Sequence, residues 1–269
     1  MALLEYYNRL INTVSEIDEV CAIGKSGGEK LPGKGESDID IFVFCDEIPK
    51  VTTRQSAVNK IGTSDCEMKF SETSGKFWGV CDFITIVGID ICLMYFTVAE
   101  MNKDIISVLD GTRLDRESEY FYPTGRCATF KNMHILYDKN RYIEEMKKKL
   151  TVYPTVLSEK LYNHHIAKIN DTEDFGRAVA RKDVLFYHTT LETAIDHFLQ
   201  ALFAFNKCFF PSRKRSVQFI DNFAYKPHNC SERLLRVIER GSKPESLQQS
   251  YDIWIELCKE FLEISDRTV

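Results

Sequence analysis

The sequence predicts an α+β protein in two parts: an N-terminal domain with a small mixed β-sheet over residues 1–128, and an α-helical bundle over 129–269. Short apolar runs bounded by glycine and other turn residues indicate strands in the first part. From about Asn132 onward, apolar residues recur at helical spacing and prolines separate the segments. The segment 110–130 between them is mixed in character and contains Pro123, which favours a domain boundary.

In the N-terminal part, residues 3–17 carry apolar side chains at helical spacing and predict an amphipathic helix. The run 20–23 predicts a first strand that leads into a glycine-rich loop, and 37–44 predicts the strand after it. Residues 78–96 predict two strands joined by a turn at Val87-Gly88. Two more helices are expected here: a short one from about Arg54, and one over 97–109 with Thr97 as its N-cap.

The second part predicts a helical bundle around one long central helix. Residues 176–206 are strongly apolar at helical spacing, which is typical of the helix that its neighbours pack around. Prolines at four positions separate the segments. The other helices are expected at 139–150, 155–169, 214–223, 231–240 and 245–264.

Composition limits the classes of protein to consider. With 44% hydrophobic and 28% charged residues, the chain has the composition of an ordinary globular protein. The chain has no run of 18 apolar residues and no basic start followed by an apolar core, so neither a membrane span nor a signal peptide is expected. Nine cysteines without a CxxC pair predict reduced thiols in a cytoplasmic protein.

The net charge of −5 argues against a general nucleic-acid binder, which is usually basic. Residues 1–130 carry 13 lysines and arginines against 21 aspartates and glutamates, a net charge of −8. The rest of the chain has a net charge of +3. An acidic metal-binding part and a basic part would suit a phosphate-bearing nucleotide, although chance asymmetry explains the difference equally well.

Two aspartates stand at the start of the second predicted strand. Because successive strand side chains point to opposite faces, Asp38 and Asp40 share one face, while Ile39 and Ile41 share the other. Two carboxylates about 7 Å apart repel each other unless a cation lies between them. Mg²⁺ is a natural candidate, because it prefers carboxylate oxygens and is usually shared with substrate phosphates.

The loop before these aspartates is rich in glycine, which lets backbone N–H groups approach and cradle an anion. A phosphate cradle followed by a carboxylate pair indicates a nucleoside triphosphate site. Residues 28–35 nearly match the P-loop pattern, but Gly35 stands where that motif needs Ser or Thr, and a strand rather than a helix follows. The P-loop is therefore set aside.

Gly24-Lys25 is followed by a spacer of twelve residues and then by Asp38-Ile39-Asp40-Ile41. This arrangement resembles the signature of the DNA polymerase beta-like nucleotidyltransferase superfamily. The sequence departs from that signature at Lys25, where the family usually has Gly or Ser. Ser26 follows at the next position and could supply the hydroxyl. The resemblance implies that Gly24, Lys25, Ser26 and Gly27 bind the triphosphate.

In that superfamily a third carboxylate comes from a strand beside the aspartate pair. Asp90, at the start of the strand after the Val87-Gly88 turn, is expected to be this residue, and with Asp38 and Asp40 it would hold two Mg²⁺ ions. An ordinary aspartate at a hairpin turn is the alternative. Asp82, on the first strand of the hairpin, is a weaker candidate.

The segment 206–215 closes the long helix with a basic cluster and resembles a motif of bacterial nucleotidyltransferases with a helical C-terminal domain. The resemblance implies that Lys214 reaches the triphosphate and Asn206 lines the site. For Arg213 and Arg215, a role in the site and a role in complementing the dipole at the end of the helix are equally good explanations. Asp183 is a candidate general base. The alternative is that it is an ordinary exposed acid near the start of a helix.

His188 is the weaker candidate base, because a lone histidine on an apolar helix is more often a core residue. The adjacent His164 and His165 point about 100° apart on a helix, so they are not expected to chelate one metal.

The sequence therefore predicts an enzyme that moves a nucleoside monophosphate, with ATP the expected donor, to a hydroxyl of a small molecule. The resemblance favours the antibiotic-modifying branch of lincosamide or aminoglycoside type. A non-catalytic, antitoxin-like module that binds a nucleotide or a partner is the alternative. RNA tailing predicts a basic groove with stacking aromatic residues, and the acidic N-terminal part speaks against it.

Overall fold

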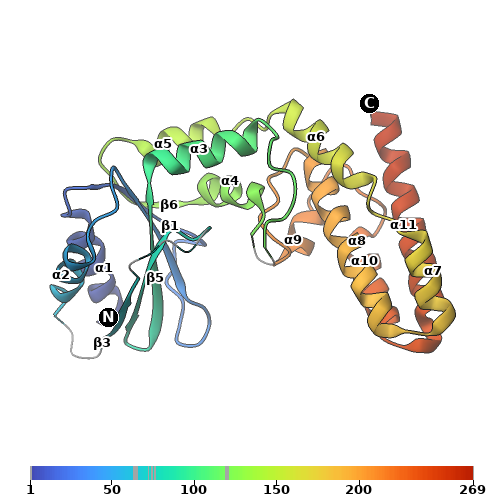
Figure 1. The fold of residues 1–269 in the computed structure, drawn as a ribbon, viewed down its shortest axis with the longest axis horizontal. Coiled ribbons are helices and arrows are strands. Elements are labelled where there is room, and N and C mark those ends of the chain that lie inside the picture. The colour runs from blue at the N-terminus through green and yellow to red at the C-terminus, as the bar shows by residue number, and fades with distance from the viewer. Residues whose placement is uncertain are drawn as a thin grey trace. The chain divides into compact units, whose positions relative to one another are not determined.

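The computed structural model describes residues 2–62, 66–71, 73, 75, 77–118 and 121–268, and Figure 1 shows its ribbon. The chain divides into two compact units. Unit 1 comprises Met1–Ser107 and Arg126–Val152, and unit 2 comprises Val108–Gly125 and Tyr153–Val269. These bounds differ from a single division at 128/129, because the chain enters unit 2, returns to unit 1 and then leaves it again. Two residues of the expected boundary segment, 119 and 120, lie outside the described part.

Unit 1 is built on a six-stranded mixed sheet with the strand order β3-β4-β5-β2-β1-β6. β2 and β5 run parallel, and every other neighbouring pair is antiparallel. The α+β class with a mixed sheet is confirmed. The strands are β1 (Val20–Lys25), β2 (Ile39–Cys45), β3 (Cys66–Phe70), β4 (Val80–Ile86), β5 (Ile89–Thr97) and β6 (His134–Asp138).

Helices cover both faces of this sheet (Figure 1). On one face, buried side chains of the strands pack with those of α1 (Ala2–Ser15) and α2 (Val51–Asn59) in one apolar core. On the other face, Phe44 contacts Phe130 and Tyr142, with ring centroids 5.0 and 5.2 Å apart. These two aromatic residues come from α4 (Pro123–Asn132) and α5 (Tyr142–Lys149), so the second face has an aromatic core of its own.

Two local predictions in unit 1 are confirmed in detail. β4 and β5 form a hairpin whose turn, Val87-Gly88, has positive φ at both residues (54° and 73°), as the tightest hairpin turns require. Thr97 caps α3 (Val98–Leu109): its Oγ1 accepts from the Glu100 N–H at 3.1 Å, and the Thr97 N–H donates back to the Glu100 carboxylate at 3.4 Å. This is a capping box.

Unit 2 is helical, with α8 (Val184–Phe205) at its centre. Buried residues of α8 pack with Trp254 and Phe261 of the last helix in a large apolar core. The other helices are α6 (Thr155–Ile166), α7 (Thr172–Arg181), α9 (Ser216–Ile220), α10 (Cys230–Gly241), the 3₁₀ turn η1 (Pro244–Ser246) and α11 (Leu247–Thr268). Within the described ranges, no helix is both long enough and apolar enough to cross a lipid bilayer.

Three segments differ from the structure predicted for them. Residues 134–138 form the edge strand β6 rather than part of a continuous helical region, because they pair with β1. Residues 176–206 do not form one helix: α7 ends at Arg181, its C-cap Lys182 has φ 54°, and α8 begins after Asp183. Residues 123–132, expected as part of a boundary, form α4.

Candidate functional site

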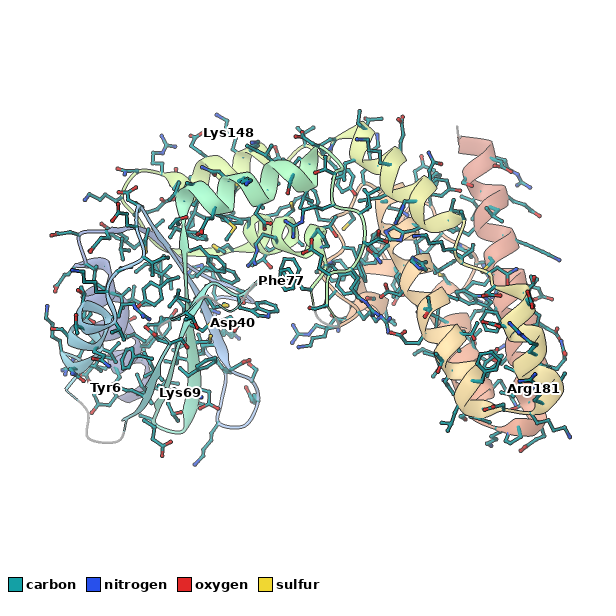
Figure 2. All side chains as sticks on the ribbon, viewed as in Figure 1. Tyr6, Asp40, Lys69, Phe77, Lys148 and Arg181 are labelled. Carbon is teal, nitrogen blue, oxygen red and sulfur yellow. The ribbon has the colours of Figure 1, made fainter. Side chains whose placement is uncertain are left out.

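The register of β2 and β5 places two of the predicted carboxylates, Asp40 and Asp90, on one face of the sheet. Ile39 pairs with Ile91 and Asp40 with Cys92 in a parallel ladder, so Asp40, Cys92 and Asp90 point to the same side. The isoleucines point to the other side and are buried in the core with α1 and α2. With ordinary strand spacing and rise, the Cα atoms of Asp40 and Asp90 are about 8 Å apart. Figure 2 labels Asp40.

Asp38 lies one residue before β2 and is exposed, as is Asp90, whereas Asp40 is half-buried. A hydrogen bond with Cys81 and burial raise the pKa of the Cys92 thiol, and the negative charges of Asp40 and Asp38 add to the rise. Both carboxylates therefore lie close enough to Cys92 to act on it. Across the hairpin, Thr85 Oγ1 donates to Asp90 Oδ1 at 2.7 Å and fixes this third carboxylate.

This donor set has the chemistry that Mg²⁺ prefers, because the ion is usually held by one or two carboxylates together with waters and phosphate oxygens. In the described part of the chain, no three His, Cys, Asp or Glu side chains converge as they would around a metal held by protein alone. Asp40 and Asp90 thus offer carboxylate oxygens of the kind that Mg²⁺ prefers on one side of the sheet.

Ser26 connects the glycine-rich loop to this face. Its N–H donates to the Asp40 carbonyl at 3.0 Å, and its hydroxyl lies 3.5 Å from Asp40 Oδ2. Gly27 has φ 77°, and a Cβ there would meet nothing within 4 Å, so glycine serves the backbone conformation rather than packing. The loop leads into β2 and not into a helix, which agrees with setting the P-loop aside.

Gly24 and Lys25, both predicted to bind the triphosphate, have packing and tethering contacts in the structure. A Cβ at Gly24 would lie 2.2 Å from Met133 Sδ, so any larger residue would require the Met133 side chain to shift. Lys25 is buried, and its Nζ donates to the carbonyl oxygens of Ser26 and Gly28. Burial lowers the pKa of Lys25. Its ammonium group thus holds the loop together from inside.

Asp82 lies on the opposite face of the sheet from Asp90. It is fully buried and forms an ion pair with Arg54, which also donates to the carbonyls of Pro49 and Ser71. Burial raises the pKa of Asp82, while the hydrogen bond from Arg54 opposes that rise. Asp82 is therefore a structural group that ties β4 to α2.

In unit 2, Asp183 and Asn206 mark the two ends of α8. The Asp183 carboxylate accepts from the Phe186 N–H at 3.0 Å and caps the first turn. Asn206 donates to the carbonyls of Leu202 and Tyr225 at 2.9 and 2.8 Å and accepts from the Tyr225 N–H. Each predicted site residue thus has a local structural role. Lys214 is exposed, and its backbone N–H donates to Ser212 Oγ at 3.1 Å.

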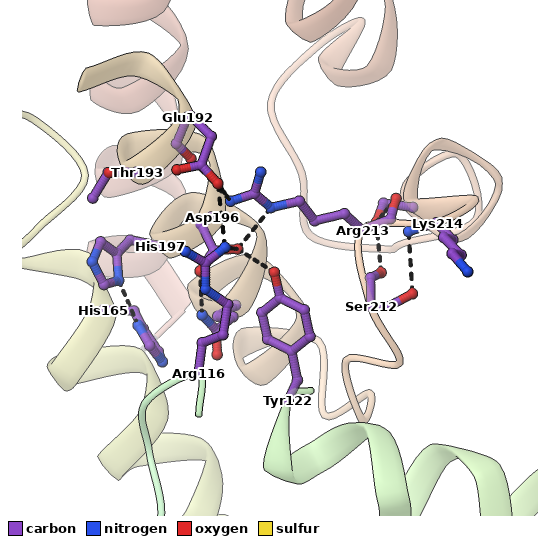
Figure 3. Close-up of polar contacts among 12 residues, drawn as sticks. Arg116, Tyr122, His165, Glu192, Thr193, Asp196, His197, Ser212, Arg213 and Lys214 are labelled. Carbon is purple, nitrogen blue, oxygen red and sulfur yellow. Dashed lines mark hydrogen bonds and ion pairs between the residues drawn. The ribbon is translucent and has the colours of Figure 1, made fainter. Parts of the chain in front are cut away.

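A polar cluster with a buried centre in unit 2 was not predicted (Figure 3). Its centre is Asp196, which accepts from Arg213 Nε at 2.8 Å and from the Tyr122 hydroxyl. Arg116 and Arg213 both pair with Glu192 as well. Burial and the hydrogen bond to Asp196 raise the pKa of Tyr122. An aspartate inside an otherwise apolar helix was the sequence signal that could have identified this cluster.

The adjacent histidines turn to different partners, as their helical positions predict. His164 Nε2 lies 2.7 Å from Asp115 Oδ1, and His165 Nδ1 lies 2.8 Å from His197 Nδ1. His188 lines a pocket beside α8 and is half-buried.

Comparisons with known proteins give partial matches. The family model described as "Domain of unknown function (DUF4037)" matches residues 121–215, and that of "YpoC-like protein" matches residues 169–266. No curated protein matches the chain. Among solved structures, the chain is similar to a nucleotidyltransferase-like protein from Exiguobacterium sibiricum 255-15, with 11% sequence identity and a TM-score of 0.48. That match covers 96% of this chain and 74% of the other.

Proposed function

We propose that the protein transfers a nucleoside monophosphate from a nucleoside triphosphate, AMP from ATP, to a hydroxyl group of a small molecule. One observation carries the proposal: Asp40 and Asp90 point to the same side at the starts of two parallel strands, and Ser26 of the glycine-rich loop contacts Asp40. Carboxylates beside an anion-binding loop suit a metal-bound triphosphate.

Asp38, Asp40 and Asp90 would hold Mg²⁺. When bound, two such ions would supply charge neutralisation at the triphosphate and at the attacking hydroxyl. The Ser26 hydroxyl and the N–H groups of the loop would hold the β- and γ-phosphates.

The acceptor class is also part of the proposal. The resemblance of residues 24–41 and about 206–214 to nucleotidyltransferases points, by analogy at the level of the fold, to the antibiotic-modifying branch, so lincosamides and aminoglycosides are the first acceptors to test. Both classes carry hydroxyl groups that can attack the α-phosphorus, with pyrophosphate as the leaving group.

The test compares the wild type with Asp40→Asn, and uses the exposed Asp18→Asn as a control of the same charge change in the same unit. A nucleotide at 100 times its Kd stabilises the folded state by roughly 2.7 kcal/mol, which at about 2–4 °C per kcal/mol is about 5–10 °C in Tm for a chain of this size. We expect this shift with MgATP, but not without Mg²⁺ and not in Asp40→Asn. With ATP labelled in the α-phosphate, label should pass to an acceptor only for the proteins and conditions in which MgATP raises the Tm.

The outcomes separate the proposal from its alternative. A Mg²⁺-dependent shift without transfer to any acceptor would favour the non-catalytic module. If Asp40→Asn transferred label as fast as Asp18→Asn does, the carboxylate site would not be the site of the reaction, and the proposal would be wrong.

A further inference from the structure

Unit 2 contains a pocket of about 390 Å³ between α8, α9 and α10. Its floor is apolar and buried, and is formed by Leu191, Leu199, Ile220 and Leu234. Pockets that bind small molecules typically have volumes of roughly 300–1,000 Å³ and mostly apolar walls with a few polar groups. This pocket has both properties.

The apolar lining continues to the surface on α10. Leu235 and Ile238 line the pocket and are 55% and 45% exposed. They lie three residues apart and therefore on one face of the helix. Apolar side chains at the mouth and an apolar floor below form one continuous surface for the non-polar part of a ligand.

Four residues with polar side chains that can carry charge line the same pocket: His188, Glu192, Arg213 and Arg215. Glu192 is already neutralised, because Arg213 pairs with it and Arg116 Nη1 lies 3.2 Å from its Oε1. Arg213 in turn is held by Asp196 at 2.8 Å (Figure 3). These two groups are therefore engaged in the cluster and do not offer a charge to a ligand.

Arg215 differs from them. It precedes the first residue of α9 with φ 63°, and its side chain is exposed. Within the part of the chain that the structure describes, its guanidinium has neither an ion pair nor a hydrogen bond. The lining of the pocket thus combines an apolar interior, a neutralised acid and an unneutralised guanidinium, with the half-buried His188 imidazole as a further polar group.

We propose that this pocket binds a small amphiphilic anion, with an apolar ring or chain between α8 and α10 and one carboxylate, sulfonate or phosphate group on Arg215. A guanidinium binds such groups through two parallel N–H···O hydrogen bonds. The site is independent of the carboxylates of unit 1 and does not require nucleotidyl transfer.

Two fluorescent dyes test the proposal on the full chain. 1-Anilinonaphthalene-8-sulfonate has the ring system and the anion, and N-phenyl-1-naphthylamine has the same rings without the sulfonate. We expect saturable 1:1 binding of the sulfonate dye, weakened about 10-fold by Arg215→Gln and largely restored by Arg215→Lys. Binding of the neutral dye should change less than about two-fold in both variants.

Arg240→Gln is the matched control, because it removes an exposed arginine of the same unit that does not line the pocket. Leu235→Asp, at an exposed position on the rim of the pocket, should weaken binding of both dyes about 10-fold. Near-UV circular dichroism confirms that each variant is folded. Wild-type affinity of Arg215→Gln for the sulfonate dye would overturn the proposal, as would an equal loss for both dyes or unchanged binding of both by Leu235→Asp.

Discussion

At the scale of single residues, the face of the sheet decides what an aspartate does. Asp82 and Asp90 lie on neighbouring strands of one hairpin, and both interrupt apolar sequence. Asp82 points into the core and is neutralised by Arg54, whereas Asp90 is exposed and held by Thr85. Successive side chains of a strand point to opposite faces of the sheet. A shift of one residue along either strand would therefore exchange the position of a structural ion pair for that of a candidate ligand.

His165 has a measurable effect on stability. It is fully buried between His197 and the Leu114 carbonyl, and burial, followed by the charges of His197 and His164, lowers its pKa from 6.5 to about 4. His165 therefore binds a proton near pH 6.5 in the unfolded chain, but only near pH 4 in the folded chain. The contribution of His165 to the free energy of unfolding should fall by roughly 3 kcal/mol as the pH drops from 6.5 to 4. Below about pH 4 this contribution should not change further.

Urea unfolding of the wild type and His165→Gln at pH 7.5, 6, 5 and 4 measures this effect. We expect the variant to lose less stability between pH 6.5 and 4 than the wild type. His228→Gln is the control, because its ring is exposed. Equal pH dependence of the wild type and His165→Gln would show that His165 is not kept neutral by the fold.

At the scale of elements, the break between α7 and α8 depends on two consecutive residues. Lys182 ends α7 in the left-handed conformation, and Asp183 caps α8 through the Phe186 N–H. An N-cap aspartate is worth about 1 kcal/mol relative to alanine, and asparagine caps as well as aspartate. Asp183→Ala should therefore lower the free energy of unfolding by about 1 kcal/mol in urea, while Asp183→Asn should change it by only a few tenths.

The same pair of variants tests the proposed general base. An amide cannot accept the proton of an acceptor hydroxyl, so a catalytic Asp183 requires that Asp183→Asn keeps its stability and loses transfer. If Asp183→Asn kept both, the cap would be the only role of this residue.

Local patterns predicted most elements of the fold, and long-range pairing explains the rest. The strands around the glycine loop, the hairpin turn and the Thr97 cap depend on neighbours in sequence, and they were predicted. β6 was not, because all five of its residues are half-buried and only pairing with β1 makes it a strand. The helix break at Lys182 was missed because no glycine or proline marks it.

The candidate site was predictable to the same extent. The side of the sheet to which Asp40 points follows from strand alternation, and the position of Asp90 follows from the hairpin. Asp38 lies before β2, so alternation does not fix its side. The contact of Ser26 with Asp40 and the cluster around Asp196 could not be predicted, since they join residues that only the folded chain brings together. Arg116 and Asp196, for example, are 80 positions apart and lie 3.6 Å from each other.

At the scale of the whole molecule, the chain order and the spatial units do not coincide. Residues 108–125 belong to unit 2, although unit 1 precedes and follows them in sequence. Their anchors are Arg116 and Tyr122, which bind Asp196, and Thr124, which donates to the Phe210 carbonyl at 3.0 Å. Residues 126–152 then return to unit 1 and supply α5, β6 and most of α4.

This arrangement predicts where the chain can be shortened. A chain of residues 1–152 keeps every strand of the sheet, whereas 1–128 loses β6 as well as Met133 and Ile143, which pack against Gly24. We therefore expect 1–152 to unfold cooperatively on heating, and 1–128 to lack a cooperative transition. Far-UV circular dichroism at 218 nm follows the sheet in both.

The second shortened chain has a specific physical defect. Without β6, the edge of β1 exposes unpaired backbone groups, and the aromatic face around Phe44 loses Phe130 and Tyr142. Each lost aromatic partner costs several kcal/mol, against a stability of only about 5–15 kcal/mol for a whole domain. A cooperative transition of 1–128 at the midpoint of 1–152 would show that residues 129–152 are not part of unit 1, and that the division at 128/129 is the physical one.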